Sequence, residues 1–168
     1  FTTSNDAVVF GQMLRDICRA LNVTEGIMQK GHMRFEPNIN VIIEHNGETY
    51  KTPIVEIKNL NSFKAVRGAI DHEFGRQIEA WAKDKKVMAK GSKSTHGWDD
   101  NKMVTFLQRE KEDEDDYRYF PDPDLVPVVV SEEWIEELKA KLPELPVAKR
   151  QRYQSELGLD HKDAAQLI

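Results

Sequence analysis

The dipeptide Asn46-Gly47 stands between two runs of alternating side chains and restricts the fold of this chain more than any other feature. From Met33 to Ile43, apolar residues alternate with polar ones, which is typical of a strand with one buried face. Asn-Gly is a strong signal for a two-residue hairpin loop. We therefore predict a returning strand through TYKTPIVEIKNL, in which Pro53 indicates an edge position or a β-bulge.

Polar side chains gather on one face of each predicted strand, because successive residues point to opposite sides. They are Arg34, Glu36, Asn38 and Asn40 on the first strand and Glu56 and Lys58 on the second. Carboxylates on neighbouring strands, with amides beside them, are oxygen ligands that suit Mg²⁺, which is completed by water and phosphate. The alternative is an outward-facing strand with ordinary surface charge.

The register decides whether Glu36 and Glu56 can meet. With a strict two-residue loop at Asn46-Gly47, Glu56 would lie opposite Pro37, and Glu36 would point to the other face. Both acids reach one ion only if the loop has an odd length or a bulge shifts the register by one residue. Pro53 favours the bulge.

A long helix follows the returning strand at once. Ser62 opens it, and apolar residues recur at helical spacing up to Lys85-Lys86: Phe63, Val66, Ile70, Phe74, Ile78 and Trp81. Asn59 and Asn61 flank its start, where free N–H groups bind phosphate readily. Capping by Asn61 or Ser62 explains the same residues without any ligand.

The remaining pattern completes an α+β prediction. We expect a helix over residues 4–22 with Val9 and Met13 on its apolar face, and a hairpin over 86–112 that turns at Asp99 to Lys102. An extended segment with a short strand up to Val130 should follow. Ser131 then caps a helix, and shorter helices follow. The predicted domains are therefore 1–130, an antiparallel sheet with helices, and 131–168, the beginning of an all-α domain.

Composition narrows the classes of protein. A net charge of −5 gives no overall attraction to nucleic acid, so such contacts must be local, and Lys149, Arg150 and Arg152 are candidates unless they are simply solvated. The single cysteine, Cys18, excludes an internal disulfide and fits a buried core thiol better than a nucleophile. No apolar run approaches the roughly 20 residues that span a bilayer. The chain starts at Phe1 without a leader, as expected for a piece of a longer protein.

Four ordered motifs carry a resemblance to a known family. They are VEIKNLNSF, STHGWDDNK, DDYRYFPDPDLVPVVV and LPELPVAKRQRYQSELGL. In this order, over nearly the whole chain, they resemble the B subunit of the aspartyl/glutamyl-tRNA(Asn/Gln) amidotransferase.

The resemblance implies a partial cradle domain like that of glutamine synthetase, followed by helices that grip tRNA. It implies a cytoplasmic heterotrimer, completed by the A and C subunits, that acts on misacylated Glu-tRNA(Gln) or Asp-tRNA(Asn). ATP and Mg²⁺ would activate the side-chain carboxylate, and ammonia that the A subunit releases from glutamine would amidate it. We expect the isolated chain to be inactive. The alternative is a non-catalytic tRNA-binding or subunit-docking module whose acids are structural.

The resemblance also assigns residues. Glu36 and Glu56 match the catalytic, metal-associated carboxylates, and the expected nucleotide, phosphate or acyl contacts are Arg34, Asn38, Lys58, Asn59, Asn61 and Arg118. Lys149, Arg150 and Arg152 would contact tRNA. Two motifs depart from the family: Arg34 to Asn38 replaces Arg-Cys-Asp-Ala-Asn, and Lys93 to His96 replaces Gln-x-Thr-Arg, so any role of that arginine is in doubt.

Overall fold

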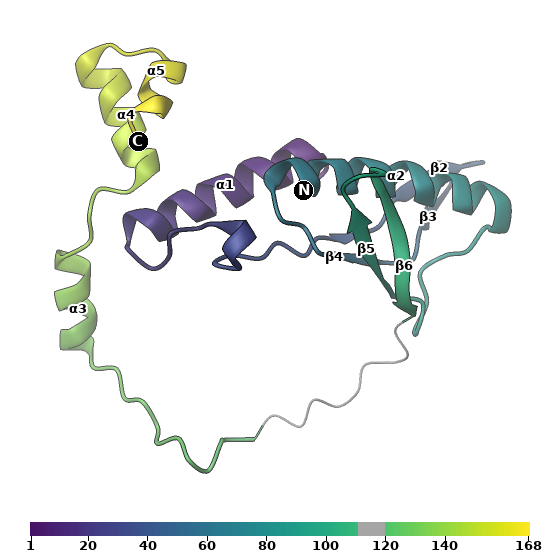
Figure 1. Ribbon diagram of the computed structural model, residues 1–168, viewed down its shortest axis with the longest axis horizontal. Helices are drawn as coiled ribbons and strands as arrows, with labels where there is room; N and C mark the ends of the chain where they lie inside the picture. Colours follow the sequence, from purple (N-terminus) through teal and green to yellow (C-terminus); the bar gives the residue numbers. More distant parts are fainter. Residues whose placement is uncertain (111–119) are drawn as a thin grey trace. The chain divides into compact units, whose positions relative to one another are not determined.

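The computed structural model describes residues 1–110 and 120–168 (Figure 1). The chain forms two compact units, Phe1–Gln12 with Ile27–Tyr117 and Met13–Gly26 with Arg118–Ile168. The predicted Arg118 contact lies outside the described residues. The domain boundary at residue 130 stays a prediction.

Helices and a sheet alternate along the first unit, which confirms the α+β class. Its elements are α1 (Ser4–Ala20), which continues into the second unit, η1 (Met28–Lys30), β1 (Asn38–Ile39), β2 (Ile42–His45), β3 (Glu48–Lys51), β4 (Val55–Lys58), α2 (Phe63–Asp84), β5 (Ser94–Asp99) and β6 (Val104–Glu110). The second unit contains α3 (Glu132–Ala140), α4 (Pro146–Leu157) and α5 (His161–Gln166).

The main sheet has four strands in the order β1-β4-β5-β6, and β2 and β3 form a separate pair. β4 and β5 run parallel, while the other pairs are antiparallel. The predicted antiparallel pairing is therefore present in every pair except β4–β5. The reason is that α2 lies between β4 and β5 in the chain and serves as the crossover connection that a parallel pair requires (Figure 1).

Both predicted hairpins are present. Asn46 and Gly47 adopt φ angles of 51° and 80°, as a tight turn with two left-handed residues requires. The return after Gly47 is not one continuous strand, however, because β3 pairs with β2 whereas β4 pairs with β1 and β5. The second hairpin, β5–β6, turns between Asp99 and Val104, close to the predicted Asp99–Lys102.

Helix α2 begins as predicted, but its buried side differs. The Ser62 Oγ accepts a hydrogen bond of 3.0 Å from the Ala65 N–H, which confirms the capping interpretation for Ser62. The buried residues of α2 are Ala65, Val66, Ala69, Glu73, Gln77 and Trp81. The predicted core positions Phe74 and Ile78 are 52% and 39% exposed, because Glu73 and Gln77 find polar partners inside and take the buried side.

The core of the first unit lies between α2 and the sheet. Ile57 of β4 is fully buried, and Val55, Ala65 and Ala69 pack around it. α1 contributes Val8 at 4% exposure, whereas the predicted Val9 and Met13 are 43% and 39% exposed, so the predicted helix face is wrong by one position. Cys18 is only partly buried, which corrects the expectation of a core thiol.

The second unit consists of short capped helices. The Ser131 Oγ accepts a hydrogen bond of 3.2 Å from the Trp134 N–H, as the sequence predicted. α4 ends at Gly158 with a φ of 66°, and α4 packs against α5, where Ala164 is fully buried. Within residues 120–130 the structure has no strand, so the predicted short strand is wrong there. Over the described ranges, no helix combines the length and apolarity that crossing a membrane requires.

Candidate functional site

A one-residue shift in register brings the predicted acids to one face of the main sheet. In the β2–β3 pair, Ile42 lies opposite Lys51, but in the β1–β4 pair Asn38 lies opposite Glu56. Between the Ile39–Val55 pair and the Ile42–Lys51 pair, the first strand segment has two residues and the second has three. The extra residue is the bulge that Pro53 indicated. As a result Glu56 is opposite Asn38 rather than Pro37, and Glu36 and Glu56 lie on the same face, while a shared ion stays a prediction.

An ammonium group joins the two acids. The Nζ of Lys58 donates to Glu36 Oε2 at 2.9 Å and lies 3.7 Å from Glu56 Oε1. The hydrogen bond to Glu36, together with the charge of Glu56, raises the pKa of Lys58 above its ordinary value, so the ammonium stays charged. The side chains of Glu36, Lys58 and Glu56 are 37%, 31% and 16% exposed, so solvent reaches all three.

The neighbouring strand β5 supports Glu56. Thr95, opposite Glu56 in the parallel register, donates its hydroxyl to Glu56 Oε2 at 3.2 Å and is 1% exposed. Two residues further, an added Cβ at Gly97 would lie 2.5 Å from the Phe106 ring, so that ring would have to move. No local pattern pointed to Thr95 as part of the site, since its pairing with Glu56 depends on the parallel strands.

The other predicted contacts border this face without joining the ion pair. Arg34, Asn38 and Asn61 are exposed. Asn59 is exposed in the left-handed conformation, with a φ of 66°, and turns the chain from β4 toward α2. These residues keep polar groups accessible at the end of β4, but their roles stay predictions.

A second carboxylate, Glu73, lies on the side of the sheet that α2 covers. It is completely buried, and it accepts hydrogen bonds from the Arg76 guanidinium, from Gln77 Nε2 at 3.0 Å and from Thr105 Oγ1 at 2.8 Å. Burial alone would raise the pKa of Glu73, but these partners outweigh it and hold the pKa below its ordinary value. The sequence pattern missed this cluster, because Glu73 and Gln77 interrupt an apolar helix face.

His96 lies beside Glu73 on the covered side. Its Nδ1 is 3.7 Å from Glu73 Oε2 and is buried without a hydrogen-bond partner among the described residues. Burial lowers the pKa of His96. The charge of Glu73 alone would raise this pKa, but the charges of Arg76 and His72 lower it further. His96 is therefore neutral at pH 7 and is turned away from the Glu36–Glu56 face.

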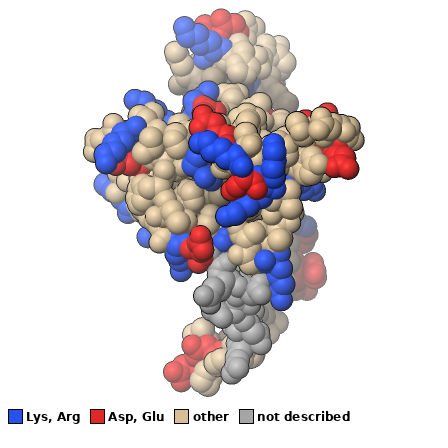
Figure 2. Space-filling model, turned by 90° about the vertical axis from the view of Figure 1, so that its right-hand side faces the viewer, with Lys and Arg blue, Asp and Glu red and all other residues tan. Residues whose placement is uncertain are grey.

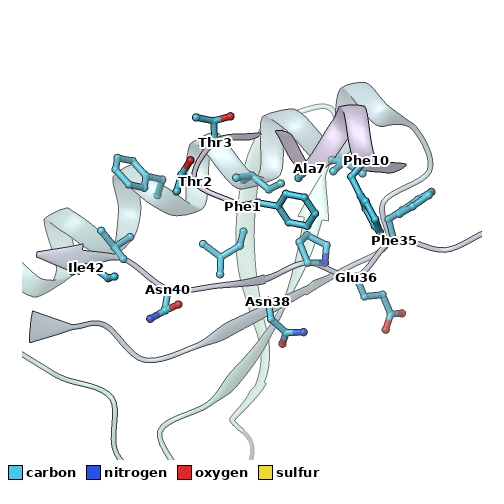
Figure 3. Close-up of a pocket in the computed structure, with 16 residues that line it drawn as sticks. Phe1, Thr2, Thr3, Ala7, Phe10, Phe35, Glu36, Asn38, Asn40 and Ile42 are labelled. Carbon is cyan, nitrogen blue, oxygen red and sulfur yellow. The ribbon is translucent and has the colours of Figure 1, made fainter. Parts of the chain in front are cut away.

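A pocket of about 530 Å³ lies between α1, α2 and the segment around β1 (Figure 3). Aromatic rings line it, including those of Phe1, Phe10, Phe35 and Phe74. In Figure 3 the side chains of Glu36 and Asn38 extend away from the two helices. The pocket and the ion-pair face therefore share a strand segment but lie on its two sides.

The predicted tRNA-contacting residues lie on α4, where Arg152 forms an ion pair within the second unit. Arg152 donates to both carboxylate oxygens of Glu144 at 2.9 Å, which holds the pKa of Glu144 below its ordinary value. Lys149 lies 5.6 Å from the Tyr153 ring centre, and Arg150 is half-buried. On the molecular face drawn in Figure 2, basic side chains lie beside acidic ones.

The carboxylate oxygens of Glu36 and Glu56 are suitable ligands for a hard cation, but they are only part of a coordination shell. Among the described residues, no group of three or more His, Cys, Asp or Glu side chains is placed to hold a metal ion. Mg²⁺ needs less from the protein, because one or two carboxylates suffice when water and phosphate complete the octahedron. Glu36 and Glu56 match that requirement in ligand type and in the face they share.

Comparison with known proteins places the chain in a family. Residues 1–136 match the family model described as the GatB/GatE catalytic domain. Proteins named as the B subunit of aspartyl/glutamyl-tRNA(Asn/Gln) amidotransferase are similar over nearly the whole chain: that of Rhodopirellula baltica is 42% identical over 99% of the chain, that of Borrelia duttonii 43% over 98%, and that of Thermotoga maritima 42% over 97%. The chain spans about a third of the length of these relatives, 33%, 34% and 33% respectively. The chain therefore belongs to the GatB/GatE catalytic-domain family.

Proposed function

We propose that this chain carries part of the site at which a tRNA-dependent amidotransferase activates the carboxylate of Glu-tRNA(Gln) or Asp-tRNA(Asn). One observation supports the proposal above the others: in a member of a catalytic-domain family, two carboxylates from neighbouring β segments meet around one lysine on an accessible face. The larger protein would work in the cytoplasm with the A and C subunits and take glutamine as its amide donor.

The proposed reaction has two steps. The substrate carboxylate attacks the γ-phosphorus of ATP, so that a C–O–P bond forms and ADP leaves. Ammonia delivered by the A subunit then attacks the acyl carbon, phosphate leaves, and the amide remains. Both steps place negative charge on phosphoryl oxygens, which fixed cationic groups stabilise.

The residues of the accessible face would divide these tasks. Glu36 and Glu56 would hold Mg²⁺, which when bound neutralises charge on the transferring phosphoryl group. The Lys58 ammonium, already placed between the two acids, would donate to a phosphate oxygen. Thr95 would keep the Glu56 carboxylate oriented through its hydroxyl. Arg34, Asn38, Asn59 and Asn61 would contact the nucleotide or the acyl end.

The test uses the full-length protein in complex with its partner subunits. Glu56→Gln removes the charge and keeps the shape of the side chain, and we expect ATP hydrolysis that depends on misacylated tRNA to fall about 10²-fold or more. Affinity for tRNA should stay unchanged. Glu44→Gln, an exposed position on β2, is the matched control and should behave like the parent.

The competing interpretation is a tRNA-binding or docking module in which Lys58 merely neutralises two structural acids. The ion pair itself is the observation in its favour. It predicts unchanged turnover in Glu56→Gln, and that result would contradict the catalytic proposal.

A further inference from the structure

The break between the hairpin and the main sheet decides on which face Glu36 lies. Ile42 pairs with Lys51, and Ile39 pairs with Val55. Between these pairs the first strand has Asn40 and Val41, while the second has the three residues Thr52 to Ile54. Side-chain direction changes accordingly along the second strand: Thr52 is buried beneath α2, whereas Glu56 and Lys58, also even-numbered, are on the accessible face.

A regular ladder continued from the hairpin would undo this arrangement. It would place Pro37 opposite Glu56 and Glu36 opposite Ile57, which is fully buried against α2. Since opposite residues of an antiparallel pair share a face, Glu36 would then turn toward the covered side. The site depends on the bulge being retained.

Two buried side chains form hydrogen bonds with the main chain beside the bulge. The Val41 N–H donates to Thr52 Oγ1 at 2.7 Å, and the Ile39 carbonyl accepts from Gln77 Nε2 at 3.1 Å. The Thr52 hydroxyl in turn donates to Gln77 Oε1. Thr52 and Gln77 are 2% and 3% exposed, so water cannot easily replace them as partners.

The orientation of Gln77 is fixed from behind. Its second Nε2 hydrogen goes to Glu73 Oε1 at 3.0 Å, and Thr105 of β6 and Arg76 hold the same carboxylate. Both Nε2 partners are acceptors and the Oε1 partner is a donor, so only one orientation of the amide suits this site. A chain of hydrogen bonds thus runs from β6 through α2 to the bulge.

We propose that Thr52 and Gln77 are positioning residues that hold the register in which Glu36 and Glu56 share a face. The inference rests on the proposed function, because it assigns these buried groups to the Mg²⁺-binding pair. Without the Thr52 hydroxyl, the Val41 N–H loses its partner, and without Gln77, the Thr52 hydroxyl and the Ile39 carbonyl each lose a contact. The regular ladder then becomes the better alternative. Neither residue contacts the substrate.

Two cysteine pairs in the full-length protein report the register directly, without Mg²⁺ or ATP. Asn38→Cys with Glu56→Cys joins residues that are opposite in the bulged register, and Pro37→Cys with Glu56→Cys joins those opposite in the regular one. After oxidation, peptide mass spectrometry measures each crosslink. We expect Thr52→Val, and likewise Gln77→Met, to lower the 38–56 crosslink and raise the 37–56 crosslink severalfold.

The functional arm uses the assembled complex with Glu36 and Glu56 intact. Thr52→Val should raise the Mg²⁺ concentration for half-maximal ATP turnover at least tenfold. Thr49→Val, the same change at an exposed position of β3, is the control and should alter neither readout. If Thr52 only stabilises the fold, Thr52→Val should lower the thermal stability. The protein that remains folded should then show the parent's crosslink pattern and the parent's Mg²⁺ dependence of ATP turnover.

The outcomes separate this inference from the proposed function. If Thr52→Val and Gln77→Met both leave the crosslink pattern unchanged, the positioning role is overturned. It is also overturned if the pattern shifts but the Mg²⁺ dependence of turnover does not, in an enzyme that Glu56→Gln inactivates. If Glu56→Gln itself leaves turnover unchanged, the proposed function has failed first. The crosslinks then still test the register alone.

Discussion

The two faces of the main sheet each carry glutamate paired with a cation, yet they differ in what surrounds the pair. On the covered face, Glu73 is completely buried and receives hydrogen bonds from Arg76, Gln77 and Thr105. On the accessible face, the Glu36 and Lys58 side chains are 37% and 31% exposed. The glutamate therefore stands in a dry environment on one face and in a wet one on the other, whereas both cations are partly exposed, Arg76 at 35% and Lys58 at 31%.

The difference separates groups that stabilise the fold from groups that are free to exchange partners. A buried carboxylate that loses a partner cannot take water instead, so its network is expensive to disturb. An exposed ion pair contributes little to stability, because water competes for both members. A ligand can therefore enter the accessible face at low cost, and the following predictions test this contrast.

The largest effect is expected on the covered face. Glu73→Leu should lower the free energy of unfolding by about 3 kcal/mol, because it leaves the buried Gln77 and Thr105 side chains without their acceptor. Urea denaturation of the 168-residue chain measures the loss. Glu73→Gln, which keeps a hydrogen-bond acceptor at this position, should cost less, and a loss as large as that of Glu73→Leu would contradict the argument.

Lys58→Met should separate activity from stability on the accessible face. In the assembled complex we expect ATP turnover to fall about 10²-fold, since a cation beside the transferring phosphate is lost. The free energy of unfolding should change by no more than about 1 kcal/mol. Lys51→Met, at an exposed position of β3, is the control for loss of charge and should leave turnover intact.

His96 should make the covered face sensitive to pH. Because burial lowers the folded-state pKa of His96 below its ordinary 6.5, the unfolded chain binds a proton more tightly. Stability is therefore complete above pH 6.5 and declines as the pH falls from there toward the folded-state pKa. Glu73, with its pKa held below its ordinary 4.5, stays ionised in the folded chain as the pH first falls below 6.5.

Thermal unfolding at about pH 7.5 and about pH 5.5, on either side of the ordinary histidine pKa, measures this dependence. His96→Leu should flatten the difference between the two values, since it removes the group that titrates in that interval. A difference that persists unchanged in the variant would assign the pH effect to another group.

The smallest effect is expected from Glu36→Gln on stability. The Glu36–Lys58 pair is partly exposed, so its removal should change the free energy of unfolding by about 1 kcal/mol or less. Urea denaturation under the conditions used for Glu73→Leu gives the comparison. A loss as large as that of Glu73→Leu would mean that the accessible pair also stabilises the fold.

Local signals in the sequence predicted the elements of the fold well. Asn46-Gly47, Ser62 and Ser131 act through hydrogen bonds within a few residues, so their turn and caps follow from the sequence alone. The parallel pairing of β4 and β5 joins residues 39 positions apart, such as Glu56 and Thr95, and leaves no such local signal. The mixed sheet was missed for that reason.

The sequence predicted those parts of the candidate site that depend on charged residues and on the alternation of side chains along a strand. Glu36, Glu56 and the bulge near Pro53 followed from that alternation. Thr95 and Gln77 did not, because each acts across the parallel pair or across the helix–sheet interface. The apolar periodicity of α2 predicted Phe74 and Ile78 as core residues, whereas Glu73 and Gln77 are the buried ones. A sequence pattern assigns polar residues to the surface because it does not show the hydrogen-bond partners that bury them.

The crossover between β4 and β5 has a consequence for how the chain folds. Glu56 and Thr95, which touch in the finished sheet, are 39 residues apart, with all of α2 between them. Closing so long a loop is entropically costly, and contacts at such separation slow folding. During synthesis the Thr95 hydroxyl therefore cannot orient the Glu56 carboxylate until β5 has left the ribosome.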